Sequence, residues 1–226
     1  MRRLSWTLLA LLLPFALPAA GAPKAPWKVG QNYFLIDPPQ PTDVPAGKVE
    51  VTEVFSYACP ACNAFYPVAD RLRESLPPNA VMDYVPAAFN PQEDWPVFQR
   101  AYFAAKVLGI AAKTHDAVFN AVWKSGQLAV YNSVTESLKD PLPTLEDLAN
   151  FYHRKTGVGT QTFLAAANSF AVNVDVRRAH DYILACHVDG TPTIIVNGKY
   201  RLDVSSAGGY DQVIELVKYL VAKESR

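Results

Sequence analysis

The sequence predicts an α/β fold, in which one mixed sheet is flanked by helices and a helical segment is inserted between its strands. A strand pattern at residues 49–55 is followed by a helical pattern and then by a second apolar run at residues 80–89. Strand patterns return only at residues 193–202, after a long stretch of helical periodicity. The first strand is apolar on both alternating faces, which is typical of a strand covered on both sides. We therefore expect the flanking strands to share one sheet and the helical stretch to form a cap.

Composition excludes several classes of protein. Half of the 226 residues are hydrophobic, which is enough for one large core or two small ones and excludes global disorder. Basic and acidic residues both number 21, so the chain lacks the strong positive field that binding to a phosphate backbone needs, and we expect no nucleic acid partner. Three cysteines are too few for a small disulfide-stapled scaffold, so any chemistry that they carry is local.

The first 22 residues have the pattern of a secretory signal peptide. Arg2 and Arg3 precede an apolar run at residues 4–17, and Ala20-Gly-Ala22 supplies the small residues of a cleavage site. The apolar run is shorter than the roughly 20 residues that span a bilayer, which disfavours an uncleaved anchor. We expect cleavage after Ala22 and export to an oxidising space, the bacterial periplasm.

The first half of the mature chain contains a strand, helix, strand unit. A lead-in rich in proline and glycine holds an edge strand at residues 33–36 and comes before the strand at 49–55. Apolar residues then recur at helical spacing over residues 60–76, until Pro77 and Pro78 end the helix. The run at residues 80–89 completes the unit.

The second half begins with helices and ends with a hairpin and one more helix. The turn dipeptide Asn197-Gly198 between two short strands predicts the hairpin. Thr144 and Asp147 have the spacing of a capping box at the start of one helix. The helices are predicted at residues 96–108, 114–124, 144–156, 160–167, 173–185 and 210–223. The predicted domains are the signal peptide at 1–22, a sheet domain at 23–89 and 186–226, and a helical domain at 90–185.

Cys59-Pro60-Ala61-Cys62 stands where the strand ends and the helix begins. Two thiols three residues apart at a helix start can form a disulfide with little backbone movement, and Pro60 suits the first helical turn. Cys59 falls at the cap position, where unpaired amides and the helix dipole favour a thiolate. Cys62 lies inside the first turn, so we interpret Cys59 as the attacking thiol and Cys62 as the resolving thiol.

A low Cys59 pKa has a consequence for the direction of the reaction. Each pKa unit favours the ionised form by about 1.4 kcal/mol, which equals about 30 mV for a two-electron couple. A strongly lowered pKa therefore stabilises the dithiol, so that the disulfide passes readily to another protein. The pattern predicts a donor of disulfides.

Two other interpretations of the cysteine pair stay open, namely a structural disulfide and a metal site. Cys186 and His187 are the only further candidate ligands, and adjacent ligands are awkward in a tetrahedral site, so we expect no metal. Cys186 follows an apolar helical pattern and is interpreted as a buried core cysteine rather than a regulatory or intermolecular thiol. The four histidines share no ligand or triad spacing and are interpreted as surface or packing residues.

Three segments together resemble the DsbA family of periplasmic thiol:disulfide oxidoreductases. They are the segment from Val51 to Cys62, Val188-Asp-Gly-Thr-Pro-Thr193 and Val196-Asn-Gly-Lys-Tyr200, and the similarity covers about residues 27–223. The resemblance implies a thioredoxin fold with an inserted helical domain and no cofactor beyond the cysteine pair. It implies unfolded exported polypeptides as substrates, a quinone-linked membrane oxidase for recycling, and a monomer.

The resemblance also implies roles for individual residues. Cys59 is nucleophilic, Cys62 is resolving, and Pro192 is a cis-proline beside the disulfide. The backbone of Thr191 would then pair with an extended substrate, and its hydroxyl would contact the Cys59 sulfur. Glu53, six residues before Cys59, would be a buried acid that relays a proton to Cys62; the alternative is a solvated acid, since Glu50 shows that the strand tolerates one.

The sequence departs from the family pattern at two places. Some relatives pair the buried acid with a lysine on the next strand, whereas residues 80–90 contain no lysine or arginine. Relatives commonly carry histidine where this chain has Ala61, which removes a positive group near the thiolate. We therefore predict a higher Cys59 pKa and a weaker oxidant than in a relative with histidine.

The first hypothesis is an enzyme that donates its Cys59-Cys62 disulfide to exported, folding proteins. The alternatives are a thiol reductase or isomerase of the same fold, and a binding module or chaperone whose cysteine pair is structural. The sequence shows no dimerisation module, which disfavours an isomerase.

Overall fold

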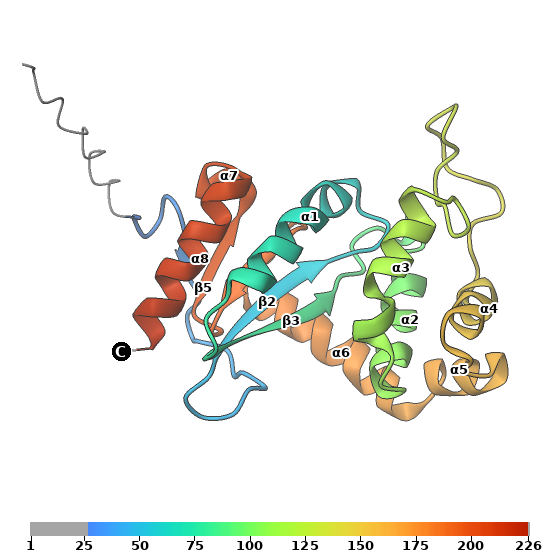
Figure 1. Ribbon diagram of the computed structural model, residues 1–226, viewed down its shortest axis with the longest axis horizontal. Coiled ribbons are helices and arrows are strands. Elements are labelled where there is room, and N and C mark those ends of the chain that lie inside the picture. Colours follow the sequence, from blue (N-terminus) through green and yellow to red (C-terminus); the bar gives the residue numbers. More distant parts are fainter. Residues whose placement is uncertain (1–26, 226) are drawn as a thin grey trace, which may run out of the picture.

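The computed structural model describes residues 27–225, so the predicted signal peptide and its cleavage near Ala22 lie outside the described residues. A five-stranded mixed sheet crosses the molecule, with the strand order β1-β5-β4-β2-β3 (Figure 1). The strands are β1 (Phe34–Leu35), β2 (Val49–Phe55), β3 (Ala80–Pro86), β4 (Thr193–Val196) and β5 (Tyr200–Asp203). This is the mixed α/β sheet that the sequence pattern predicts and the thioredoxin fold that the family resemblance implies.

The central strand β2 joins distant parts of the chain. It pairs in parallel with β3, with Glu53 opposite Tyr84, and antiparallel with β4, with Glu53 opposite Ile194. The strands β4 and β5 form the predicted hairpin, whose turn residues Asn197 and Gly198 both have positive φ. Residues 49–55 and 193–196 therefore lie side by side, although the whole helical segment separates them in sequence.

Helices connect and cover the strands. Between β3 and β4 the described chain contains a short 3₁₀ turn, five helices and loops (Figure 1). No helix among residues 27–225 is both long and apolar enough to cross a bilayer. The helices are α1 (Pro60–Ser75), η1 (Pro91–Glu93), α2 (Trp95–Val107), α3 (Ala111–Trp123), α4 (Leu145–Thr156), α5 (Thr160–Ala167), α6 (Phe170–Ala185), α7 (Val204–Ala207) and α8 (Tyr210–Glu224).

Different helices pack against the two faces of the sheet. Val49 and Val51 of β2 belong to a core that also contains Leu72 of α1 and Leu216 of α8. Val54, further along the strand and on the opposite face, belongs to a second core that continues into α2 to α6. The sheet and the helical segment thus share one apolar core, and their division into two domains at residues 89/90 and 185/186 stays a prediction.

The predicted elements differ from the structure mainly at their ends. The Thr144–Asp147 capping box is present at α4, as expected. The strand predicted at residues 80–89 ends at Pro86, because Pro86 pairs with Phe55, the last residue of β2. The helix predicted from residue 173 begins at Phe170, because the Ser169 side chain caps it by accepting from the Val172 N–H. The prediction for residues 114–124 started three residues too late, and α7 was not predicted.

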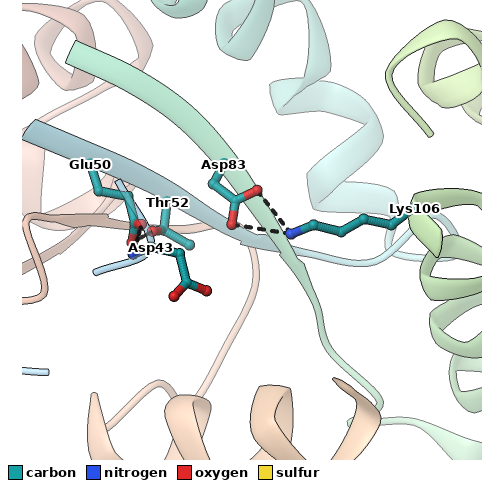
Figure 2. A network of polar contacts seen from close by, with 5 residues as sticks. All are labelled: Asp43, Glu50, Thr52, Asp83 and Lys106. Carbon is teal, nitrogen blue, oxygen red and sulfur yellow. Dashed lines mark hydrogen bonds and ion pairs between the residues drawn. The ribbon is translucent and has the colours of Figure 1, made fainter. Parts of the chain in front are cut away.

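A polar network lies on the face of β2 and β3 that points away from α1 (Figure 2). The Glu50 carboxylate accepts hydrogen bonds from the Asp43 N–H at 2.8 Å and from the Thr52 hydroxyl at 3.0 Å. Asp83 forms an ion pair with Lys106 at 3.3 Å. Glu50 is therefore a buried but fully partnered acid, not a solvated one.

Candidate active site

The end of β2 and the start of α1 position Cys59. The strand ends at Phe55, the helix begins at Pro60, and Cys59 is the N-cap residue with an extended backbone. The Cys62 backbone N–H donates to the Cys59 Sγ at 3.3 Å. A sulfur thus occupies the place where a serine or aspartate oxygen usually caps a helix, facing amides that have no helical partner.

The loop before β4 forms the second wall of the site. The Thr191–Pro192 peptide bond is cis, as the resemblance implied. In its thiol form the Cys59 Sγ donates a hydrogen bond to the Thr191 carbonyl at 3.6 Å, a distance within the range of a sulfur donor. Because β4 pairs with β2, the sheet brings this loop beside Cys59 from 132 residues away.

The two thiols have opposite electrostatic properties. The pKa of Cys59 is lowered to about 6, first by its hydrogen bond with the Cys62 side chain and then, against the effect of burial, by Thr191 and by the Cys62 and Ala61 amides. The pKa of Cys62 is raised well above its ordinary value, mainly by burial and by its bond with Cys59. Cys59 is therefore the thiol that ionises at neutral pH.

Solvent exposure also distinguishes Cys59 from Cys62. Cys62 is fully buried, whereas Cys59 is 4% exposed and is followed by two exposed residues, Pro60 and Ala61. The Thr191 hydroxyl lies near both sulfurs and has no hydrogen-bond partner elsewhere among residues 27–225. An approaching thiol therefore meets Cys59 first.

Glu53 is buried on the α1 side of β2. It shares this face with Val51, it is 2% exposed, and its Oε2 has no hydrogen-bond partner among the described residues. Burial, and then the negative charges of Asp70 and Cys59, raise the pKa of Glu53 to about 8. The alternative of a solvated Glu53 is wrong, and at neutral pH this carboxyl is mostly protonated.

A tyrosine on β3 lies opposite Glu53. Register pairs Tyr84 of β3 with Glu53, and the pKa of Tyr84 is raised to about 12, first by burial and then by the charge of Glu53. The Tyr84 ring packs against His115, with the ring centroids 4.5 Å apart. A neutral group therefore faces the buried acid from β3, so no cation on that strand lowers the pKa of Glu53.

The sequence analysis missed an aromatic cluster that supports the loop before Cys59. Tyr57 is buried, and its hydroxyl is 2.9 Å from the His115 Nδ1. Burial lowers the pKa of His115 to about 4, so this histidine is neutral at pH 7. The Trp123 indole N–H donates to the Tyr57 carbonyl at 2.7 Å. These residues belong to elements that are far apart in the sequence. Only the position of Tyr57, two residues before Cys59, indicated a role near the active site.

The remaining predicted groups lie away from this site or add no ligands. Cys186 is fully buried at the end of α6, as expected for a core cysteine. Within residues 27–225 no three histidine, cysteine or acidic side chains are arranged to hold a metal ion. The site brings together two thiols, a helix terminus, a threonine and a buried acid.

The chain is similar to known proteins over most of its length. A family model described as Thioredoxin matches residues 44–216. The thiol:disulfide interchange protein DsbA of Pseudomonas aeruginosa is 34% identical over 96% of this chain and 95% of its own length. The DsbA of Azotobacter vinelandii is 32% identical over 87% of this chain and 84% of its own length.

Solved structures agree with the sequence comparisons. A crystal structure of P. aeruginosa DsbA superposes with a TM-score of 0.72 and 34% identity, over 88% of this chain and 94% of that one. DsbA from Xylella fastidiosa gives a TM-score of 0.74 and 32% identity, over 87% of this chain and 97% of that one. The similarity therefore includes the helical segment as well as the sheet.

Proposed function

Because this chain belongs to the DsbA family of thiol:disulfide oxidoreductases, we propose that it donates a Cys59-Cys62 disulfide to exported polypeptides as they fold. The observation that carries the proposal is the Cys59 Sγ at the start of α1, where it accepts the Cys62 N–H and has a pKa of about 6. A site that stabilises this thiolate favours the dithiol over the disulfide. Electrons therefore flow from the client to the enzyme.

Transfer takes two exchanges. A client thiolate attacks the Cys59 sulfur, forms a mixed disulfide and displaces Cys62 as a thiolate. A second client thiolate then attacks the client sulfur of the mixed disulfide and displaces Cys59, which leaves easily because of its low pKa. The client gains one disulfide, and the enzyme retains the two electrons as a dithiol.

Glu53 is the proposed proton donor in the first exchange. The Cys62 thiolate is released in a fully buried position, where its high pKa demands a proton. Glu53 lies near enough for its ionised form to raise the pKa of Cys62. At neutral pH the Glu53 carboxyl is mostly protonated, and its Oε2 has no hydrogen-bond partner among residues 27–225 that would compete for the proton. The proton moves from Glu53 to Cys62 as the sulfur–sulfur bond breaks.

The cellular setting follows from the same family and belongs to the proposal. We place the mature protein in the periplasm, after cleavage near Ala22, as a monomer that needs no cofactor besides Cys59 and Cys62. Its clients are unfolded exported polypeptides, whose extended backbone pairs with Thr191 beside Pro192. A quinone-linked membrane oxidase removes the electrons and restores the disulfide.

A transfer assay tests the direction of the reaction. The oxidised protein is mixed in equal amount with a reduced, unfolded polypeptide that contains two cysteines, and the free thiols of each partner are counted over time. A donor loses its own disulfide and creates one in the client. A reductase leaves the client reduced and instead opens client disulfides when supplied as dithiol, and that outcome would overturn the proposal.

Restoring a histidine between the cysteines is expected to strengthen the thiolate. In Ala61→His, an imidazole at the exposed second position of α1 adds a donor or a positive charge near the Cys59 Sγ. The Cys59 pKa should fall below that of the parent, by roughly half a unit to one unit. The pH dependence of iodoacetamide alkylation measures it, with Ala61→Gln as a neutral control. An unchanged or raised pKa would count against this account.

Replacing Glu53 by a neutral residue is expected to stabilise the folded protein at neutral pH but not at pH 4. Folding raises the pKa of this acid from 4.5 to about 8, so the folded state binds more protons than the unfolded state between these values and stability falls as pH rises through them. Glu53→Gln mimics the protonated acid and should raise the free energy of unfolding by about 3 kcal/mol at pH 7. At pH 4 the difference should vanish.

Urea denaturation at both pH values measures the effect, and Glu50→Gln is the matched control. Glu50 lies on the same strand, and burial raises its pKa too, but both of its carboxylate oxygens accept hydrogen bonds. The amide NH2 of glutamine cannot accept one of these bonds, so this replacement should give a clearly smaller gain in stability, or none. An equal gain in both variants, or a gain for Glu53→Gln at pH 4, would show that Glu53 is not an unpartnered buried acid.

A further inference from the structure

A large cavity opens beside the reactive cysteine, on the side of the helical segment. Its volume is about 990 Å³, and its lining runs from Pro60 to the C-terminal end of α3 and the loop at residues 124–139. This loop projects between α3 and α4 (Figure 1). Since Pro60 directly follows Cys59, the cavity begins one residue from the sulfur that exchanges.

The walls of the cavity are ordered by hydrogen bonds. The Lys139 N–H donates to the Val130 carbonyl at 2.9 Å, and the Asn132 N–H donates to the Ser137 carbonyl at 2.8 Å, so the loop closes on itself. The Trp123 indole is fixed to the Tyr57 carbonyl. The site is therefore formed before a ligand arrives, which lowers the entropic cost of binding.

Aromatic and apolar groups form the interior, and charges lie at the rim. The rings of Trp123 and Tyr131 lie 6.0 Å apart at 32°, and Ala129 lines the cavity with them. Burial, a hydrogen bond with Glu93 and the charges of Glu93 and Cys59 raise the pKa of Tyr131, so the Tyr131 hydroxyl lies within electrostatic range of the sulfur. An apolar interior with a polar rim suits a large side chain of a peptide, and the volume also leaves room for the peptide backbone beside it.

We propose that this cavity, which we call the Trp123 subsite, binds an aromatic or large aliphatic side chain close in sequence to the client cysteine. The proposal rests on the proposed function and extends it from chemistry to selectivity. In the mixed disulfide the client cysteine is bonded to Cys59. The client chain on either side of that cysteine therefore passes over Pro60 or over the loop that contains Thr191. Client residues that pass over Pro60 meet the subsite, so its occupant is a side chain of the extended client segment.

Photo-crosslinking of a trapped intermediate tests the subsite. In Cys62→Ser, the Cys59 thiolate attacks a peptide whose single cysteine carries thionitrobenzoate, forms the mixed disulfide and releases the coloured thiolate. The peptides carry benzoylphenylalanine at successive positions on either side of the cysteine. We expect crosslinks within residues 122–139 for peptides labelled on one side.

The outcomes separate the two proposals. Crosslinks confined to other surfaces, with normal release of thionitrobenzoate, would overturn the subsite alone. Release no faster than from free cysteine would overturn the proposed function and, with it, the subsite.

A pocket-filling variant gives a second test in the same Cys62→Ser background. The parent should react about tenfold faster with a peptide bearing phenylalanine at the crosslinking position than with its alanine counterpart. Ala129→Phe places an aromatic ring inside the cavity and should lower this ratio toward one, whereas Ala165→Phe, on an exposed position of α5, should retain it. Equal rates for the two peptides in the parent, or a full ratio in Ala129→Phe, would contradict the subsite.

Discussion

Replacing Cys59 by serine is expected to abolish disulfide transfer, with a loss of at least about a thousandfold in the rate of client oxidation. Serine retains the N-cap geometry and the bond from the Cys62 N–H, but its hydroxyl neither forms a disulfide nor ionises at neutral pH. The fold should therefore persist while the chemistry is lost. The transfer assay with a reduced two-cysteine client measures the effect.

Cys62→Ser is the matched variant and should behave differently. Cys59 keeps its thiolate and still forms mixed disulfides, but no second enzyme thiol releases them, so covalent complexes with clients accumulate on non-reducing gels. Transfer that survives in Cys59→Ser, or trapping that occurs in Cys59→Ser and not in Cys62→Ser, would reverse the assignment of the attacking and resolving thiols.

The reduced protein is expected to become more stable, relative to Cys59→Ser, as pH rises. The pKa of Cys59 in the folded state, about 6, lies below its ordinary value of 9.0. The stabilisation is therefore complete above pH 9 and is lost as pH falls through 6. Between pH 6 and pH 9 the difference in free energy of unfolding should grow by about 3 kcal/mol.

Denaturation of both reduced proteins across this pH range measures the difference. Because each carries Glu53, the opposite pH dependence of that acid largely cancels. At pH 7 the same ionisation favours the dithiol by about 1.4 kcal/mol, which corresponds to about 30 mV of added oxidising strength. A difference that stays constant from pH 6 to pH 9 would mean that the thiolate is not stabilised.

Local patterns predicted those parts of the fold and site that depend on neighbouring residues. The strand at residues 49–55 is predicted correctly, because its residues are apolar on both faces. The position of Cys59 at the helix N-cap could be predicted from the strand before it, the proline after it and the helical periodicity that follows, all within 20 residues. The hairpin at Asn197-Gly198 is equally local.

Contacts between distant elements were not predictable from these patterns. Trp123 reaches the Tyr57 carbonyl across 66 residues, and Tyr84 lies opposite Glu53 only because of the β2–β3 register. The loop at residues 124–139 has no periodicity, so its closure beside Pro60 could not be inferred. Only the resemblance, and not local pattern, placed Thr191 against Cys59.

A redox titration with glutathione tests the central claim most directly. The oxidised protein is equilibrated at pH 7 with graded ratios of reduced to oxidised glutathione, and tryptophan fluorescence, to which Trp123 near Cys59 contributes, reports the fraction reduced. The account predicts a potential above the roughly −270 mV of thioredoxin. A potential at or below that value would mean that the disulfide, and not the Cys59 thiolate, is the favoured state.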